Sequence, residues 1–110
     1  MAHLSEIIQK TYHKYSPIIE KAGVKFNLDF PDTTLTLGDD SHVAKALDKT
    51  MQSAVSRTRD GVINNTVRKN QIVVEDTGTI LSKTACELFT TEHIKVKSRV
   101  GFGTKVTIKW

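Results

Sequence analysis

Residues 73–78, Val-Val-Glu-Asp-Thr-Gly, place a carboxylate and a glycine at the end of an apolar run. The run predicts a buried strand, and its last acid, Asp76, could accept hydrogen bonds from the amino group of an adenine ring. Gly78 has no Cβ, so its backbone would allow a flat ring to approach closely. The pattern is typical of one wall of a purine site, although Asp76 is equally well placed to cap the turn that follows it.

The composition excludes several other kinds of site. The single cysteine, Cys86, rules out an internal disulfide and a cysteine-based zinc site. The four histidines show no metal-ligand spacing, so no metal site is expected. No apolar run approaches the roughly 20 residues of a membrane span, and the first residues lack the layout of a signal peptide. We therefore expect a cytoplasmic protein without a membrane partner.

The net charge is +4 and the isoelectric point is near 9.3, which suggests an acidic partner. Five cations alternate along two C-terminal strand patterns, namely Lys95, Lys97, Arg99, Lys105 and Lys109. They could form a solvated sheet face that keeps an edge soluble, or a patch for nucleic acid or an acidic protein surface. We prefer the solvated face, because aromatic side chains for base stacking are not interleaved there.

Hydrophobic periodicity predicts the elements that carry these residues. Helical spacing covers residues 4–22, where Pro17 could introduce a kink, then residues 43–58, and a short segment after Leu81. Alternation predicts strands at residues 24–30, 33–37, 62–67, 71–75, 94–98 and 106–110. Turns are expected at residues 31–32, 69–70 and 101–103, and a helix cap at Asp39, Asp40 or Ser41.

This order predicts one domain, residues 1–110, of the α/β class: a two-layer sandwich in which helices cover one face of a mixed, mostly antiparallel sheet. The central helix carries the clearest apolar stripe, which is expected to be buried: Val43, Ala46, Leu47, Thr50, Met51, Ala54, Val55 and Thr58. Leu47 and Met51 should pack against Phe26, Val74 and Ile108. The first strand should bury Val24, Phe26, Leu28 and Phe30, and the short helix should bury Leu81, Ala85, Leu88 and Phe89.

Four segments in a fixed order, residues 40–47, 74–78, 87–89 and 94–104, resemble the ATP-binding domain of sensor histidine kinases. That domain belongs to the GHKL superfamily, whose fold is also called the Bergerat fold. The resemblance covers nearly the whole chain and implies a histidine kinase-like ATPase fold. It also implies that Asp76 and Gly78 correspond to the family's adenine-binding motif.

The departures from the family pattern concern the phosphates and the magnesium ion. Where the resemblance implies an acidic or amide residue and a magnesium-binding asparagine, this chain has Lys49 and Ser53. A charged lysine cannot bind a metal, and a serine hydroxyl is shorter than an asparagine amide. Residues 90–93 stand where the family has its ATP lid, a glycine-rich segment and a further helix. The chain therefore resembles the kinase fold without its lid.

These departures favour a non-catalytic domain that works by protein–protein interaction, because phosphoryl transfer depends on the groups that are missing. The hypothesis is an inhibitor or regulator of a two-component histidine kinase or of its response regulator. No catalytic residue and no required cofactor are expected. Asp76 and Gly78 would be a vestigial adenine site, and the exposed rim would bind the partner through Lys49, Ser53, Arg57, Glu92 and His93.

Three alternatives stay open at this point. The domain could be a sensor that binds an adenine nucleotide weakly beneath Asp76 and Gly78 without phosphotransfer. It could be a nucleic-acid-binding module that uses the basic sheet face, which we rank below a protein partner. It could also be a deliberately shortened, engineered domain. The sequence does not distinguish a phage protein from a host protein.

Overall fold

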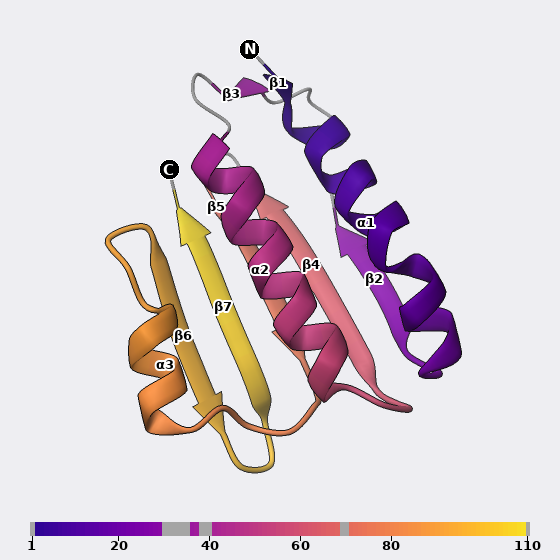
Figure 1. Cartoon of the computed structure of the whole chain (residues 1–110), viewed down its shortest axis with the longest axis vertical. Helices are drawn as coiled ribbons and strands as arrows, with labels where there is room; N and C mark the ends of the chain where they lie inside the picture. The colour runs from indigo at the N-terminus through magenta and orange to yellow at the C-terminus, as the bar shows by residue number, and fades with distance from the viewer. Residues whose placement is uncertain (1, 30–35, 38–40, 69–70, 110) are drawn as a thin grey trace.

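The computed structural model describes residues 2–29, 36–37, 41–68 and 71–109, and in this part three helices lie on one face of a five-stranded sheet (Figure 1). The helices are α1 (Leu4–Lys21), α2 (Ser41–Arg57) and α3 (Lys83–Phe89). The sheet strands are β2 (Lys25–Asp29), β4 (Val62–Arg68), β5 (Gln71–Asp76), β6 (Ile94–Arg99) and β7 (Gly103–Lys109). None of the described helices is long and apolar enough to cross a membrane.

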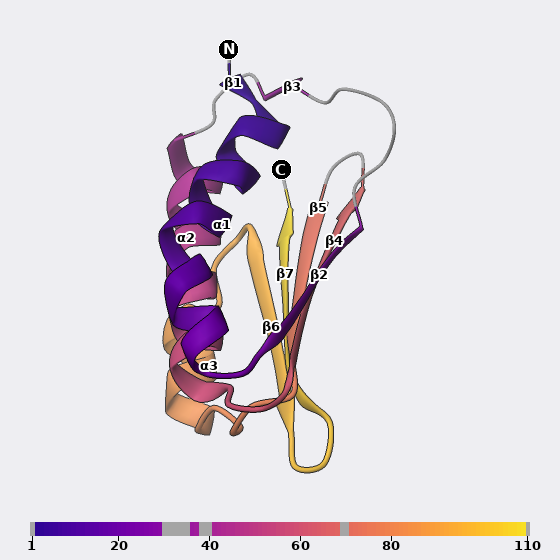
Figure 2. The same ribbon diagram turned by 90° about the vertical axis from the view of Figure 1, so that its right-hand side faces the viewer.

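The sheet has the strand order β2-β4-β5-β7-β6. Strands β2 and β4 run parallel, and the other three pairs are antiparallel. Figure 2 shows helices α1, α2 and α3 on one side of this sheet, and none of the described helices covers the other side. The predicted two-layer α/β sandwich with a mixed, mostly antiparallel sheet is confirmed.

Helix α2 supplies the centre of the core. Every residue of its predicted stripe is buried, and Leu47 and Met51 are among the most deeply buried side chains. They belong to one apolar cluster with Val74 and Ile108, and Phe26 packs against that cluster. Burial of a side chain of this size contributes about 1.5–3 kcal/mol. The spacing of small and large apolar residues along α2 therefore fixes this helix over the middle of the sheet.

Helix α1 is attached to α2 by polar contacts as well as by packing. The Tyr15 hydroxyl donates to Oδ1 of Asp48 at 3.0 Å, and the Lys14 ammonium lies 2.9 Å from the same oxygen. The hydrogen bond from Lys14 lowers the pKa of the Asp48 carboxyl below its usual value. Asp48 thus connects α1 to α2 on the outer surface of the helix layer.

The strand predicted at residues 33–37 does not pair with β2. Its described part, β3 (Thr36–Leu37), instead pairs antiparallel with β1 (Ala2–His3) in a separate two-stranded sheet. Strand β1 was not predicted, because two residues are too short for a periodic pattern. The predicted turn at residues 31–32, the caps Asp39 and Asp40 and the connection at residues 69–70 lie outside the described residues, as does Phe30.

Two predicted apolar faces are wrong in part. Leu28 is exposed, because β2 is an edge strand and only its beginning, next to Val24 and Phe26, reaches the core. Leu88 is 77% exposed, and α3 contains no buried residue at all. Helix α3 packs beside β6 at the edge of the layer (Figure 1), and of its predicted apolar face Leu81, Ala85 and Phe89 are half-buried.

Candidate functional site

Asp76 is the last residue of β5, at the end of the sheet where α2 also ends. Its side chain is only 2% exposed, so the carboxylate does not face open solvent. Its Oδ1 accepts a hydrogen bond from the backbone N–H of Gly78 at 3.0 Å. Asp76 therefore caps the turn that follows β5, which is the structural role that the sequence allowed for it.

The guanidinium of Arg57, the last residue of α2, lies directly on this carboxylate. Nη2 of Arg57 is 3.0 Å from Oδ2 of Asp76, and Nη1 is 3.2 Å from Oδ1. The Arg57 side chain is 13% exposed, so the pair is largely shielded from water. Two parallel charge-assisted hydrogen bonds of this kind are among the strongest polar contacts in proteins. Both oxygens of the Asp76 carboxylate are therefore already engaged within the protein.

Arg57 also makes hydrogen bonds to other groups inside the protein. Nη1 donates to the Thr79 carbonyl at 2.7 Å and to Oγ1 of Thr104 at 3.1 Å, and Nε donates to Oγ of Ser53 at 3.2 Å. Thr104 in turn shares a 2.8 Å hydrogen bond with the Ser98 hydroxyl. The network joins α2, the loop after β5, β7 and β6. Hydrogen bonds to four different residues thus hold the Arg57 guanidinium in one position.

Gly78 is required by packing. A Cβ at this position would lie 2.4 Å from the Arg57 carbonyl oxygen and 2.7 Å from Oγ1 of Thr58. The N–H of Thr79 donates to the same Arg57 carbonyl at 3.1 Å, so the loop is bound directly to the end of α2. The glycine thus allows the close approach of two backbone segments, and its presence requires no ligand.

Comparison with known proteins gives no match to a family model and none to a curated protein. Among solved structures, the nucleotide-free catalytic domain of the histidine kinase ThkA is 20% identical, with a TM-score of 0.70, and the match covers 98% of this chain and 94% of that one. The mycobacterial sensor histidine kinase MprB is 13% identical, with a TM-score of 0.72 and coverage of 97% and 93%.

This chain has the fold of a histidine kinase catalytic domain. A structure of ThkA in complex with the response regulator TrrA also matches, at 19% identity and a TM-score of 0.66, covering 97% of this chain and 40% of that one. At such identities the likeness concerns the fold alone. What this kinase-like fold does in the present chain depends on its own residues.

A surface hollow of about 480 Å³ lies next to the Arg57–Asp76 pair in this kinase-like fold. Its lining consists of Ser56, Arg57, Arg59, Thr77, Gly78 and Thr79. None of these residues has an aromatic or aliphatic side chain on which a purine ring could stack, and pockets for small molecules are mostly apolar. In this respect the hollow differs from a typical small-molecule pocket.

Lys49 and Ser53 stand where the resemblance implied an acidic or amide residue and a magnesium-binding asparagine, and both side chains make contacts within the protein. Lys49 is exposed on α2, and its ammonium lies 5.1 Å from the ring centre of Phe89 on α3. Ser53 is half-buried and accepts the hydrogen bond from Arg57. Within the described part of the chain, no group of three His, Cys, Asp or Glu side chains could hold a metal ion.

The predicted rim is brought together only in part. Glu92 and His93 are exposed in the four-residue connection between α3 and β6, where Thr91 and Ile94 exchange backbone hydrogen bonds of 3.0 and 3.3 Å. Arg57 does not belong to an exposed rim, because its guanidinium turns inward to Asp76. Sequence analysis missed this pair, since nothing in the spacing of positions 57 and 76 shows that the two side chains meet.

Proposed function

We propose that this domain is non-catalytic and acts by binding a protein of a two-component pathway, either a histidine kinase or its response regulator, as an inhibitor or regulator. The observation that carries the proposal is the bidentate contact between Arg57 and Asp76. It engages both oxygens of the carboxylate that would recognise adenine, so a nucleotide would have to compete with a shielded ion pair for that carboxylate.

The phosphate side of the site supports the same proposal. Catalysis of phosphoryl transfer consists largely of positioning the phosphates and stabilising their charge with metal ions and backbone amides. The helix positions where metal ligands were expected hold Lys49 and Ser53. The connection between α3 and β6 is four residues long, residues 90–93, which is too short for a lid or a phosphate-binding loop. We therefore infer that the domain is not an enzyme.

The fold supports this class of partner. One solved relative of this fold is a histidine kinase in complex with a response regulator. A domain that retains the fold of a kinase domain, but not the groups that bind a nucleotide, can bind such a partner protein without transferring phosphate to it. This would give the domain a regulatory effect that depends on its concentration.

The proposal is tested with the purified histidine kinases and response regulators of the organism that encodes this chain. We expect one of them to bind the domain, and we expect the rate of kinase autophosphorylation or of transfer to the regulator to change as the domain is added. A small basic protein of unrelated fold serves as the control. If no member of the panel binds more tightly than it binds the control, the proposed partner class is wrong.

The absence of catalysis is tested separately, by phosphate release from magnesium-ATP with the domain alone. No release above buffer is expected. Hydrolysis that follows the protein through two different chromatography steps would contradict the non-catalytic assignment.

A further inference from the structure

The uncovered face of the sheet consists of two halves with different electrostatics. On the β2–β4 half, polar groups are paired with one another. The Asn27 amide donates to Oδ1 of Asn64 at 2.8 Å, and Arg68 lies 3.0 Å from the carboxylate of Asp29. This half has both charge signs and resembles an ordinary solvated surface.

The β7–β6 half is almost entirely cationic. Its five charged side chains are exposed, and within the described part of the chain none of them forms an ion pair; they are Lys95, Lys97, Arg99, Lys105 and Lys109, and we call them the basic face. Lys97 lies directly opposite Lys105 in the antiparallel register. Like charges in that position destabilise a sheet, so solubility alone does not explain their arrangement.

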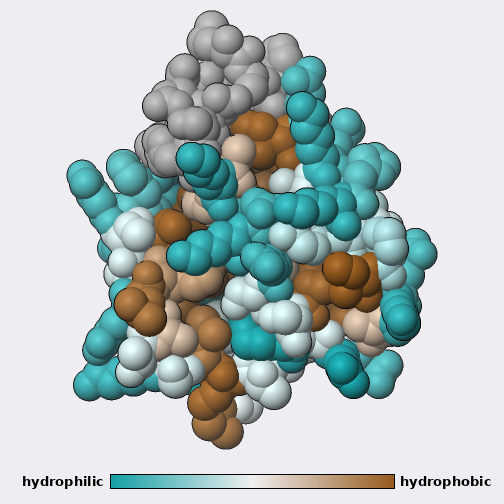
Figure 3. Space-filling model, in the orientation of Figure 1, coloured by the Kyte–Doolittle hydropathy of each residue, from teal (hydrophilic) through white to brown (hydrophobic). Residues whose placement is uncertain are grey.

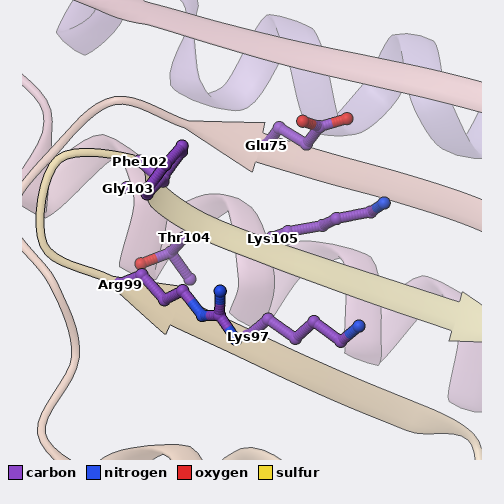
Figure 4. Close-up of a pocket in the computed structure, with 7 residues that line it drawn as sticks. All are labelled: Glu75, Lys97, Arg99, Phe102, Gly103, Thr104 and Lys105. Carbon is purple, nitrogen blue, oxygen red and sulfur yellow. The ribbon is translucent and has the colours of Figure 1, made fainter.

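The basic face is hollowed along its length. One hollow of about 330 Å³ includes Lys97, Arg99 and Lys105, and a second of about 230 Å³ includes Lys95 and Lys109. Lys97 and Lys105 line both hollows, so the two hollows are neighbours, and we call them together the trough. Figure 4 shows the first hollow, with side chains from β5, β7 and β6 and with Phe102 at the turn.

An apolar knob stands at the end of this trough. Phe102 and Val100, in the turn between β6 and β7, are 81% and 80% exposed. The turn has a defined shape, because Gly101 and Gly103 adopt positive φ angles of 87° and 85° and the Phe102 N–H donates to the Arg99 carbonyl at 3.1 Å. Apolar surface projects at the lower end of the molecule in Figure 3, where Figure 1 shows this turn.

We propose that the basic face binds an acidic surface of a protein partner, and that Phe102 enters an apolar pocket on that partner. This inference rests on the proposed function and assigns the contact surface for it. A buried aromatic anchor beside complementary charges is the usual composition of a tight interface, in which the charges raise the association rate and the anchor slows dissociation.

The chemistry favours a protein over nucleic acid. Proteins that bind single strands stack successive bases on aromatic side chains, whereas here Phe102 lies at the end of the trough and, among the residues that the structure describes, no aromatic side chain lies between the cations. Four of the five cations are lysines, and arginine is the residue that matches phosphate in a bidentate way. Glu75, opposite Lys105, would repel a continuous row of phosphates. A second copy of this chain would present the same positive charges and is disfavoured for that reason.

The test uses two variants with the same change in net charge. Lys97→Glu with Lys105→Glu reverses the centre of the basic face, and Lys10→Glu with Lys45→Glu reverses two exposed lysines of the helix layer, one on α1 and one on α2. Binding to poly-L-glutamate, to oligothymidylate of equal charge and to vesicles containing phosphatidylserine is measured at about 0.1 M salt, where the Debye length is about 10 Å. Circular dichroism verifies that each variant is folded.

We expect the Lys97/Lys105 pair of substitutions to weaken poly-L-glutamate binding about tenfold or more, and the helix-layer pair to change it less than about twofold, because screened charges act locally. Phe102→Ser should leave poly-L-glutamate binding unchanged and weaken binding to a partner from the two-component panel about tenfold.

The proposal is overturned if both pairs weaken binding equally, if only the helix-layer pair does, or if oligothymidylate or the vesicles bind more tightly than the peptide. These results do not depend on finding a two-component partner. If the panel fails while poly-L-glutamate binds at Lys97 and Lys105, the partner class is wrong and the assignment of the surface stands.

Discussion

Charged side chains on the two faces of the sheet have opposite environments. On the helix-covered face, Arg57 and Asp76 neutralise each other and share their remaining hydrogen bonds with neighbouring groups. On the uncovered face, five cations stay exposed along β6 and β7. The region that resembles a ligand site is thus occupied by the protein itself, and the region that resembles plain surface carries the groups able to bind a partner.

The largest expected effect comes from removing one member of the buried Arg57–Asp76 pair, which tests whether the two faces of the sheet differ in this way. We expect Asp76→Asn to lower the free energy of unfolding by about 3–5 kcal/mol, because the Arg57 guanidinium loses its counter-ion in a shielded position. Chemical denaturation at neutral pH measures the change. The matched control is Asp29→Asn, which breaks the exposed pair with Arg68 and should cost no more than about 1 kcal/mol. Equal losses in the two variants would show that Arg57–Asp76 is not a shielded pair.

The next largest effect concerns the core beneath α2. Replacing Leu47 or Met51 with Ala should cost roughly 2–5 kcal/mol, since both side chains are fully buried against the sheet. Thermal melts of the two variants measure this loss, and Leu88→Ala on the exposed side of α3 is the control that should leave the melting temperature nearly unchanged. Core variants that melt at the wild-type temperature would contradict the fold at its centre.

The smallest expected effect is a gain in stability on the uncovered face. Lys97→Glu converts a like-charge pair with Lys105 into an opposite-charge pair, and we expect about 0.2–1 kcal/mol of stabilisation at low salt. Lys25→Glu on β2 is the control, because its register partner, Val62, carries no charge. A loss of stability in Lys97→Glu, or an equal gain in Lys25→Glu, would show that the basic face is not under electrostatic strain.

Much of the fold could be predicted from periodicity alone. The stripe of α2 and the alternation along β6 and β7 depend on burial, and burial is recorded directly in the order of apolar and polar residues. The prediction failed where a segment lies at an edge. Leu28 and Leu88 have the spacing of buried residues but no element above them, and the pairing of β3 with β1 depends on the path of the chain between elements.

Individual residues of the candidate site could be predicted from the sequence, but the contact between Arg57 and Asp76 could not. Asp76 and Gly78 were identified from their pattern, and the turn-capping role of Asp76 was one of the two interpretations that the sequence left open. The position of the Arg57 guanidinium was not predictable, because it depends on the angle at which the last turn of α2 meets the end of β5. A side chain nineteen positions away along the chain leaves no periodic signal.

The central claim is that Arg57 blocks the part of the site where adenine would bind, and that none of the described residues is placed to hold the phosphates of a nucleotide. Calorimetric titration of the wild-type domain with ATP and with adenosine, each with and without magnesium, tests it most directly. We predict that ATP binds no better than adenosine and that magnesium makes no difference. A magnesium-dependent gain of about 2 kcal/mol or more for ATP over adenosine, which exceeds tenfold in affinity, would contradict the account.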